Sequence, residues 1–183
     1  MKINSRFHLF VLTAMLILSA PQSPAKVIYV AQDAPGSQTG EDWQNAFTTI
    51  TAGLTASASG DELWVKSATY SEAISLKSGI ALYGGFEGSE NELEERDWNT
   101  HTTIIDATGL NTHAITVNNA NNVKIDGFII TGGEGNDFGG GLLCVSSDLH
   151  LMHCTLTNNN NLVSRPGYGF GAGIYSEGSS INI

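Results

Sequence analysis

The acidic turn Glu134-Gly135-Asn136-Asp137 is the part of this sequence best suited to holding a metal ion. Carboxylate and amide oxygens in a flexible turn are the ligands that calcium prefers. Glu134 and Asp137 are therefore the candidate calcium ligands, although their spacing does not follow that of a known calcium loop. We expect no obligatory cofactor, and calcium is the ion that this turn could hold.

Glycoside hydrolysis needs two carboxylates that face each other across a groove. Asp106, Asp126 and Asp148 are candidates, because outward residues of stacked strands form ladders about 4.8 Å apart. However, Asp106 and Asp148 also suit turns, and Asp126 precedes Gly127 as at the end of a strand. The sequence therefore assigns neither catalytic nor substrate-binding residues.

A lyase needs a basic side chain beside clustered carboxylates, so that it can take a proton from a sugar acid. The basic residues of the repeated region and its approach are Lys66, Lys77, Lys124 and Arg165. Their spacing stacks none of them beside two or three carboxylates. Lys124 and Asp126 alternate along one strand, which is typical of an ordinary surface pair.

Histidines and cysteines give no clear site either. His150 and His153 are three residues apart in a strand segment, so we expect them to point to opposite faces and not to share a metal. Cys144 and Cys154 both fall on the predicted inner face, as buried thiols or as a disulfide. We identify no Ser-His-Asp arrangement and no phosphate-binding loop.

The elements that would position these residues are short and repeated. The stretch Gly139–Leu151, GGGLLCVSSDLHL, returns 32 residues later as GAGIYSEGSSINI, and a related pattern precedes it at an offset of 26. Units of a few short strands cannot bury an apolar face alone, so they must stack as a solenoid. Leucine-rich repeats are the alternative, but the abundance of β-branched residues, Gly and Asn favours an all-β parallel β-helix.

The repeat predicts which residues point inward. The inner pairs are Ile115 and Val117, Val123 and Ile125, Phe128 and Ile130, Leu142 and Cys144, Leu149 and Leu151, and Cys154 and Leu156. Glycine is expected at the sharp corners between strands, at 132–133, at 139–141 and in Gly171-Ala172-Gly173. Asparagine is expected there as well, at 118–119, 121–122 and 158–161.

Two segments before the repeats have a different character. Trp43, Phe47, Ile50 and Leu54 are spaced as on one helical face after Asp42, which predicts an amphipathic helix that caps an open end of the solenoid. Residues 87–99 are rich in carboxylates and contain a single arginine. This composition predicts a solvated surface loop.

The ends and the charge of the chain indicate export. Lys2 and Arg6 precede an apolar run at 9–18, too short to span a membrane, and Ser23-Pro24-Ala25 fits a signal peptidase site. We therefore expect a signal peptide at 1–25 and a β-helix domain at 26–183. Cleavage leaves 6 basic residues against 18 acidic ones, a net charge of −12, which excludes nucleic acid and anionic membranes as partners. We expect no membrane insertion within the mature chain.

Several segments resemble secreted bacterial right-handed parallel β-helix repeat proteins of the pectate-lyase-like superfold. They are IYVAQDAPG, DWQNAFTTITAGL, GDELWVKSATYSE, SGIALYGGFEGSE and TTIIDATG. The later GGGLLC and CTLTNN are also similar to repeats of chlamydial polymorphic outer membrane proteins, with Cys154 where those repeats have an aromatic residue. The resemblance implies a right-handed β-helix with an N-terminal cap, at the cell surface or outer membrane.

Activity varies among such proteins, so the resemblance leaves three functions open. The first is a scaffold for adhesion or glycan contact, with a polysaccharide or a neighbouring or host cell surface as partner. The second is a lyase or hydrolase of acidic polysaccharides, and the third is a structural stalk. Because the sequence stops within a repeat without a polar cap, we expect a fragment of a larger protein.

Overall fold

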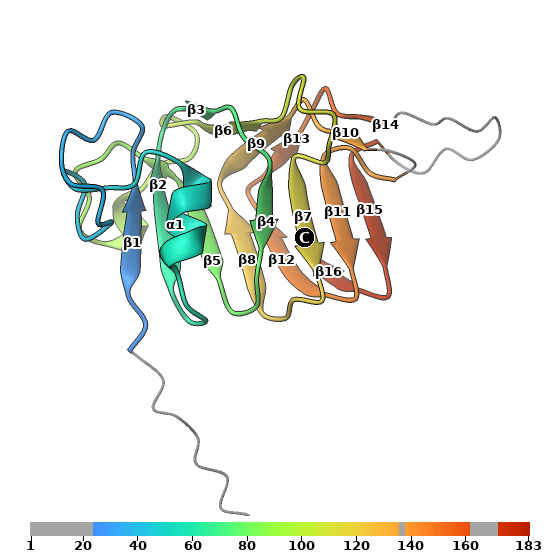
Figure 1. Ribbon diagram of the computed structural model, residues 1–183, viewed down its shortest axis with the longest axis horizontal. Helices are drawn as coiled ribbons and strands as arrows, with labels where there is room; N and C mark the ends of the chain where they lie inside the picture. Colours follow the sequence, from blue (N-terminus) through green and yellow to red (C-terminus); the bar gives the residue numbers. More distant parts are fainter. Residues whose placement is uncertain (1–23, 136–137, 162–171) are drawn as a thin grey trace, which may run out of the picture.

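The computed structural model describes residues 24–135, 138–161 and 172–183, which wind into a parallel β-helix (Figure 1). Nearly all of the predicted signal peptide lies outside these residues, as do Asp137 and Arg165. The described helices include none long and apolar enough to cross a membrane.

Three parallel sheets form the sides of the solenoid. The first sheet contains β1 (Val27–Val30), β2 (Glu62–Lys66), β5 (Ala81–Phe86), β8 (Val123–Asp126), β12 (Asp148–Met152) and β16 (Ser180–Asn182). The second contains β3 (Thr69–Tyr70), β6 (Thr103–Asp106), β9 (Phe128–Thr131) and β13 (Thr155–Leu156). The third contains β4 (Ile74–Leu76), β7 (Ile115–Asn118), β11 (Leu142–Val145) and β15 (Ile174–Glu177).

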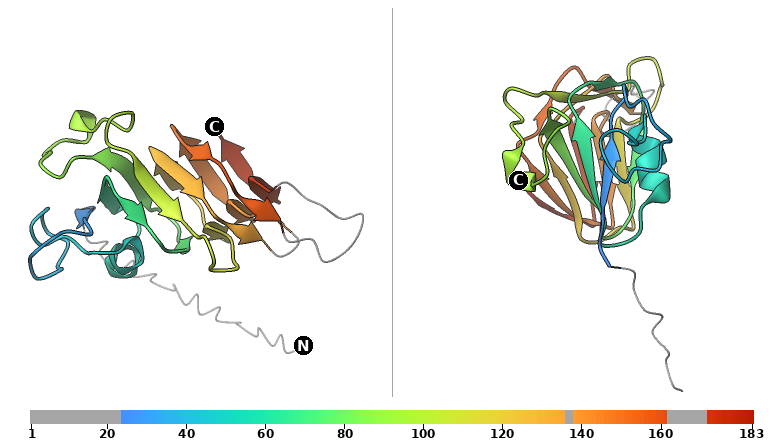
Figure 2. Two further views of the ribbon diagram at one scale, coloured as in Figure 1. Left: turned by 90° about the horizontal axis from the view of Figure 1, so that it is seen from above. Right: turned by 90° about the vertical axis from the view of Figure 1, so that its left-hand side faces the viewer.

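The chain passes from the first sheet to the second and third and then starts the next coil (Figure 2). Each strand pairs in parallel with its counterpart one coil later: Val123 of β8 lies opposite Leu149 of β12, an offset of 26 residues. The pair β10 (Glu134–Gly135) and β14 (Asn160–Asn161) continues this stacking at one corner. The predicted solenoid and its offset are therefore confirmed.

Alternation along each strand sends every second side chain into one continuous core. The predicted inner pairs from Ile115 to Leu151 are at most 3% exposed. Cys154 and Leu156 are only partly buried, although they pack against the same core. The two cysteines are free thiols, so the disulfide alternative is not realised.

The corners use glycine and asparagine in different ways. Asn119, Asn122 and Asn158 have φ values of 50°, 59° and 51°, in the left-handed region that asparagine tolerates. Gly133 has no positive φ, but a Cβ there would lie 2.0 Å from the carbonyl oxygen of Gly140, which lies in the same coil between β9 and β11. This glycine is therefore needed for close backbone approach and not for a left-handed corner.

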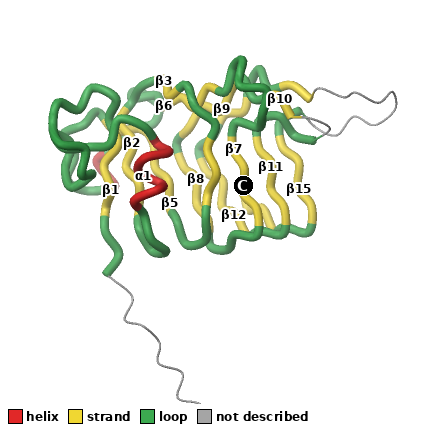
Figure 3. The backbone as a smooth tube through the Cα atoms, in the orientation of Figure 1, coloured by secondary structure: helices red, strands yellow, loops and turns green. Residues whose placement is uncertain are grey.

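The predicted helix is shorter than its sequence pattern. α1 spans Ile50–Ala56 (Figure 3). Thr49, not Asp42, is its N-cap: the Thr49 hydroxyl accepts a hydrogen bond from the amide of Ala52. Before it, Phe47 forms a parallel bridge with Val30 of β1. The prediction of a helix from residue 42 is wrong because backbone pairing with β1 holds this stretch extended.

A second apolar cluster lies outside the solenoid, on the outer face of the first sheet. Trp64 stacks on Phe86 with ring centroids 4.9 Å apart, and Trp43 covers Phe86 at 5.4 Å. Trp43 also donates a hydrogen bond from Nε1 to the carbonyl oxygen of Glu90 at 2.9 Å. This contact ties the loop before α1 to the acidic segment 87–99, hereafter the insert.

The insert is largely solvated, as its composition predicts, because all of its carboxylates except that of Glu90 are exposed. It is nevertheless fixed to the fold at particular residues. Glu90 is only 8% exposed, and its carboxylate accepts hydrogen bonds from the amides of Glu87, Gly88 and Ser89. A short 3-10 helix, η1 (Leu93–Glu95), follows. The insert is an ordered strap across the first sheet.

Candidate functional site

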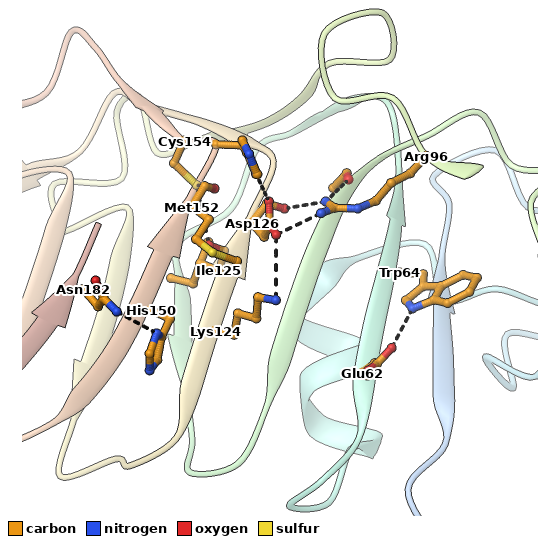
Figure 4. Close-up of polar contacts among 12 residues, drawn as sticks. Glu62, Trp64, Arg96, Lys124, Ile125, Asp126, His150, Met152, Cys154 and Asn182 are labelled. Atoms are coloured by element: carbon orange, nitrogen blue, oxygen red, sulfur yellow. Dashed lines mark hydrogen bonds and ion pairs between the residues drawn. The ribbon is translucent and has the colours of Figure 1, made fainter. Parts of the chain in front are cut away.

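Asp126, the last residue of β8, is a buried carboxylate surrounded by cations (Figure 4). Its residue is 2% exposed. Oδ2 lies 2.9 Å from Nη2 of Arg96, and Oδ1 lies 2.8 Å from Nδ1 of His153. Lys124 lies further away, with its Nζ 4.0 Å from Oδ2. These four residues are the Asp126 cluster, and they replace the predicted ordinary surface pair of Lys124 and Asp126.

Arg96 reaches this cluster from the insert. Its Nη1 donates hydrogen bonds to the carbonyl oxygens of Gly84, at 3.0 Å, and Asp126, at 3.3 Å. Its guanidinium also lies 5.0 Å from the ring centroid of Tyr83 and 4.9 Å from that of Trp98. A planar guanidinium suits such combined stacking and ion pairing. With a side chain only 7% exposed, Arg96 anchors the insert to the sheet.

A bulge in β5 makes room for this anchor. The pairing of β2 with β5 shifts between Trp64, opposite Tyr83, and Lys66, opposite Phe86. The extra residue falls at Gly84-Gly85, and Gly85 has a φ of 93°. The shift turns the carbonyl oxygen of Gly85 to the insert, where it accepts a hydrogen bond from the amide of Asp97 at 2.8 Å.

Gly127, next to Asp126, permits the same close approach from the other side. Its φ is 84°, and a Cβ there would lie 3.0 Å from Nη1 of Arg96 and 3.2 Å from Cβ of Trp98. The sequence Asp126-Gly127 is therefore the place where the repeat accommodates the insert.

His153 follows the end of β12 and has a φ of 47°, an unusual conformation for this residue. Its ring stacks on Trp98 of the insert with centroids 4.0 Å apart, and its side chain is 47% exposed. The prediction that His150 and His153 point to opposite faces assumes a continuous strand and is wrong. His150 lies on β12, whereas His153 is turned toward Asp126.

A hollow of about 410 Å³ opens beside this stack, hereafter the Trp98 hollow. The side chains and backbone that line it come from the end of the insert, the start of β6, β9, and the turn into β13. The lining residues are Trp98, Asn99, Thr102, Thr103, Gly127, Phe128, Ile129, His153, Cys154 and Thr155. None of these residues is a carboxylate, a lysine or an arginine.

Cys154 does not give the Trp98 hollow a nucleophile. Burial raises the pKa of its thiol to about 11, so the thiol stays protonated at neutral pH. Its Sγ donates to the carbonyl oxygen of Met152 at 3.1 Å. A cysteine-histidine pair with His153 is thus not set up for attack.

The three predicted aspartates do not come together. Asp106 ends β6 in the second sheet, and its carboxylate accepts hydrogen bonds from the hydroxyl and amide of Thr108, which lower its pKa. Asp148 begins β12, and the residue of β12 opposite Asp126 is Met152. These three carboxylates therefore do not form a pair that faces across a groove.

The remaining predicted residues have separate surroundings. Lys66 pairs with Asp33 at 2.7 Å, and Lys77 donates to the carbonyl oxygen of Ser57. Glu134 lies in β10, while its predicted partner Asp137 lies outside the described residues. Within the described ranges there is no group of three or more histidine, cysteine or acidic residues that could hold a metal.

Sequence reasoning missed Arg96, Trp98 and His153. The signals for them were the doubled glycine of Tyr83-Gly84-Gly85-Phe86, which marks a bulge, and the one arginine among the acidic residues of the insert. The contact of His153 with Asp126 joins residues 27 positions apart, so it follows from the coil register and not from local spacing.

Comparison of the chain with protein-family models and with curated proteins gives no match. The fold therefore defines the class of this protein, a parallel β-helix solenoid with one short helix. The Asp126 cluster and the neighbouring Trp98 hollow are the features on which a function can be argued.

Proposed function

We propose that this chain is an exported β-helix scaffold of the pectate-lyase-like superfold that contacts glycans at the Trp98 hollow. One observation carries the proposal: the hollow combines aromatic and uncharged polar groups, and the nearest buried carboxylate, Asp126, is already bound by Arg96 and His153. Such a site is equipped to bind rather than to transform a ligand.

The lining suits the two faces of a sugar ring. Trp98 and Ile129, both partly exposed, offer apolar surface to the C–H groups of a pyranose, and tryptophan is a residue typical of such amphipathic contacts. Asn99 and Thr155 supply an amide and a hydroxyl to the sugar hydroxyls. An apolar pocket with a few convergent polar groups is the usual form of a small-ligand site.

A polysaccharide hydrolase or lyase has less support. Hydrolysis needs a second carboxylate across the site, and lyase chemistry needs a free base near clustered carboxylates. Arg96 and His153, the basic groups nearest the Trp98 hollow, both contact the carboxylate of Asp126. A purely structural stalk remains the alternative if no glycan binds.

The proposed partners are polysaccharides of a neighbouring or host cell surface, met by a secreted or outer-membrane-associated protein. The proposal needs no metal ion. Calcium is included in the test because Glu134 stands in an acidic turn that could supply oxygen ligands.

The proposal is tested by binding the purified mature chain to an array of neutral and acidic glycans, with and without calcium. We expect binding that falls in Asn99→Ala and Trp98→Ala, and no change in Tyr175→Ala, an aromatic control on the third sheet. A parallel assay follows reducing ends and unsaturated products. Product release would support the enzyme alternative, and an empty array from folded protein would leave the stalk.

A further inference from the structure

We infer that the Trp98 hollow selects a neutral, hydroxyl-rich sugar over a uronic acid, with Nε2 of His153 accepting a hydrogen bond from a sugar hydroxyl. The inference rests on the proposed function, because it names the ligand class of the same hollow. It also separates this site from the acidic polysaccharides that the sequence resemblance suggests.

Asp126 fixes the tautomer of His153. Asp126 forms an ion pair with Arg96, and a carboxylate can only accept hydrogen bonds. Its contact with Nδ1 of His153 at 2.8 Å therefore requires the proton on Nδ1. In the neutral ring the other nitrogen, Nε2, then carries a lone pair and is an acceptor.

Nε2 is also the part of the ring that a ligand can reach. His153 lines the Trp98 hollow with 47% of its side chain exposed, and Nδ1 is occupied by Asp126. Among the described residues, the hydrogen bond of the His153 ring is the one between Nδ1 and Asp126. The stacking on Trp98 holds the ring in place, so the acceptor is preorganised for a donor in the hollow.

The cations of the Asp126 cluster are not offered to a ligand. Arg96 is 7% exposed and, like Lys124, does not line the Trp98 hollow. A uronate carboxylate would enter a site without lysine or arginine, beside an acceptor nitrogen, on a chain whose formal net charge is −10. Desolvating a carboxylate without an ion-pair partner is costly, so the anionic sugar is disfavoured.

The remaining polar groups fit hydroxyls as well. Thr103 is committed to the fold, since its hydroxyl accepts from the amide of Gly85 at 2.9 Å. Thr155 is exposed, and the side chain of Asn99 reaches the hollow from the insert. Both can donate and accept, as sugar hydroxyls do.

The test is a titration of the mature chain with neutral and acidic hexasaccharides of equal length. The neutral probes are cellohexaose, mannohexaose and galactohexaose, and the acidic probes are hexagalacturonate and hexaguluronate, at 0.15 M salt. We expect the best neutral probe to bind at least tenfold more tightly than either acidic probe.

The variant His153→Asn tests the contribution of Nε2 to binding. Asparagine tolerates the left-handed backbone, and its amide can still donate to Asp126, but it has no acceptor at the Nε2 position. We expect it to weaken neutral-sugar binding about five- to tenfold, the effect of one lost hydrogen bond. His150→Asn is the matched control, because His150 lies outside the hollow on β12, and it should leave binding unchanged.

A second variant, Thr155→Lys, adds the missing cation. It should improve binding of the acidic probes about fivefold without improving the neutral ones. Thermal unfolding of every variant checks that the fold is retained.

The outcomes of these titrations distinguish the ligand class, the role of Nε2 and the proposed function. Tighter binding of an acidic probe to the wild-type chain overturns the inference and leaves the proposed glycan contact intact. Neutral binding that is lost in Asn99→Ala but unchanged in His153→Asn overturns the role of Nε2. If no probe and no glycan on the array binds, the proposed function fails, and the inference fails with it.

Discussion

The interior of the solenoid and the outer face beneath the insert are built on different principles. Inside, equivalent positions carry equivalent residues: Ile74, Ile115 and Leu142 are neighbours across three strands of the third sheet. On the outer face, Asp126 has Tyr83 and Met152 as its cross-strand neighbours, and the three share no chemistry.

This difference shows which part of the molecule depends on individual residues. A repeated apolar row is stabilised by burial that each coil contributes in the same way. The Asp126 cluster instead depends on single residues, because removing one partner leaves another charge buried. A candidate site therefore arises where the insert interrupts the repeat, and four substitutions test this comparison.

The largest effect on stability is expected when the carboxylate of Asp126, which the other residues of the cluster contact, is removed. Asp126→Ala leaves the buried guanidinium of Arg96 unpaired, which should lower the free energy of unfolding by about 4 kcal/mol. Urea denaturation followed by circular dichroism measures it. Asp148→Ala, at a half-buried carboxylate on β12, should cost less than about 0.5 kcal/mol, and equal effects would remove the distinction.

In the interior, the free energy of unfolding should fall with the side-chain volume that a substitution removes. Ile115→Ala creates a cavity at a fully buried position of β7 and should cost about 3 kcal/mol in the same assay. Thr116→Ala, at the neighbouring outward position, should change the free energy of unfolding very little. A cost below about 1 kcal/mol for Ile115→Ala would mean that the coil does not pack as a closed core.

The bulge should be sensitive to a single methyl group. At Gly84 a Cβ would lie 2.5 Å from the carbonyl oxygen of Gly127, so Gly84→Ala should cost about 2 kcal/mol. Gly173 has nothing within 4 Å of the same atom, and Gly173→Ala should be neutral or slightly stabilising. Thermal melts of the two alanine variants give the comparison, and equal shifts would argue against close packing of β5 on β8.

The smallest effect should be the pH response of the insert. Burial opposes ionisation of Glu90, but the amides of Glu87, Gly88 and Ser89 prevail and lower its pKa. Its stabilisation is therefore present above the ordinary glutamate pKa and is lost as pH falls through the lowered folded value. Glu90→Gln should lose stability at pH 7 and differ little from wild type near pH 3; a difference that grows on acidification would contradict this sign.

Repeated positions could be predicted from the sequence because their information is redundant. Val123, Ile125 and Leu149 follow from alternation within a strand and from the 26-residue offset between coils. The start of α1 could not be read in the same way, since Phe47 has helical spacing but pairs with Val30 across the chain. Tertiary pairing there overrides a local period.

The candidate site could not be predicted from the sequence for a related reason. Arg96 lies 30 residues before Asp126, in an insert between β5 and β6 that has no repeat to fix its register. Its charges predicted solvation, because composition does not reveal that one arginine finds a buried carboxylate. The doubled glycine at 84–85 and the one arginine of the insert were the signals in the sequence, and the glycines pointed to a close approach of two backbone segments.

Hydrogen exchange of the free mature chain tests the central claim most directly, namely that the insert is part of the built structure. The amide of Asp97, which donates to Gly85, and the amide of Gly85, which donates to Thr103, report on its attachment. We predict that both exchange nearly as slowly as core amides of β8 in the wild-type chain. In Asp126→Asn, exchange across residues 87–99 should accelerate while the third sheet stays protected. Fast exchange of these amides in the wild-type chain would contradict the account, because the Trp98 hollow would then have no fixed wall.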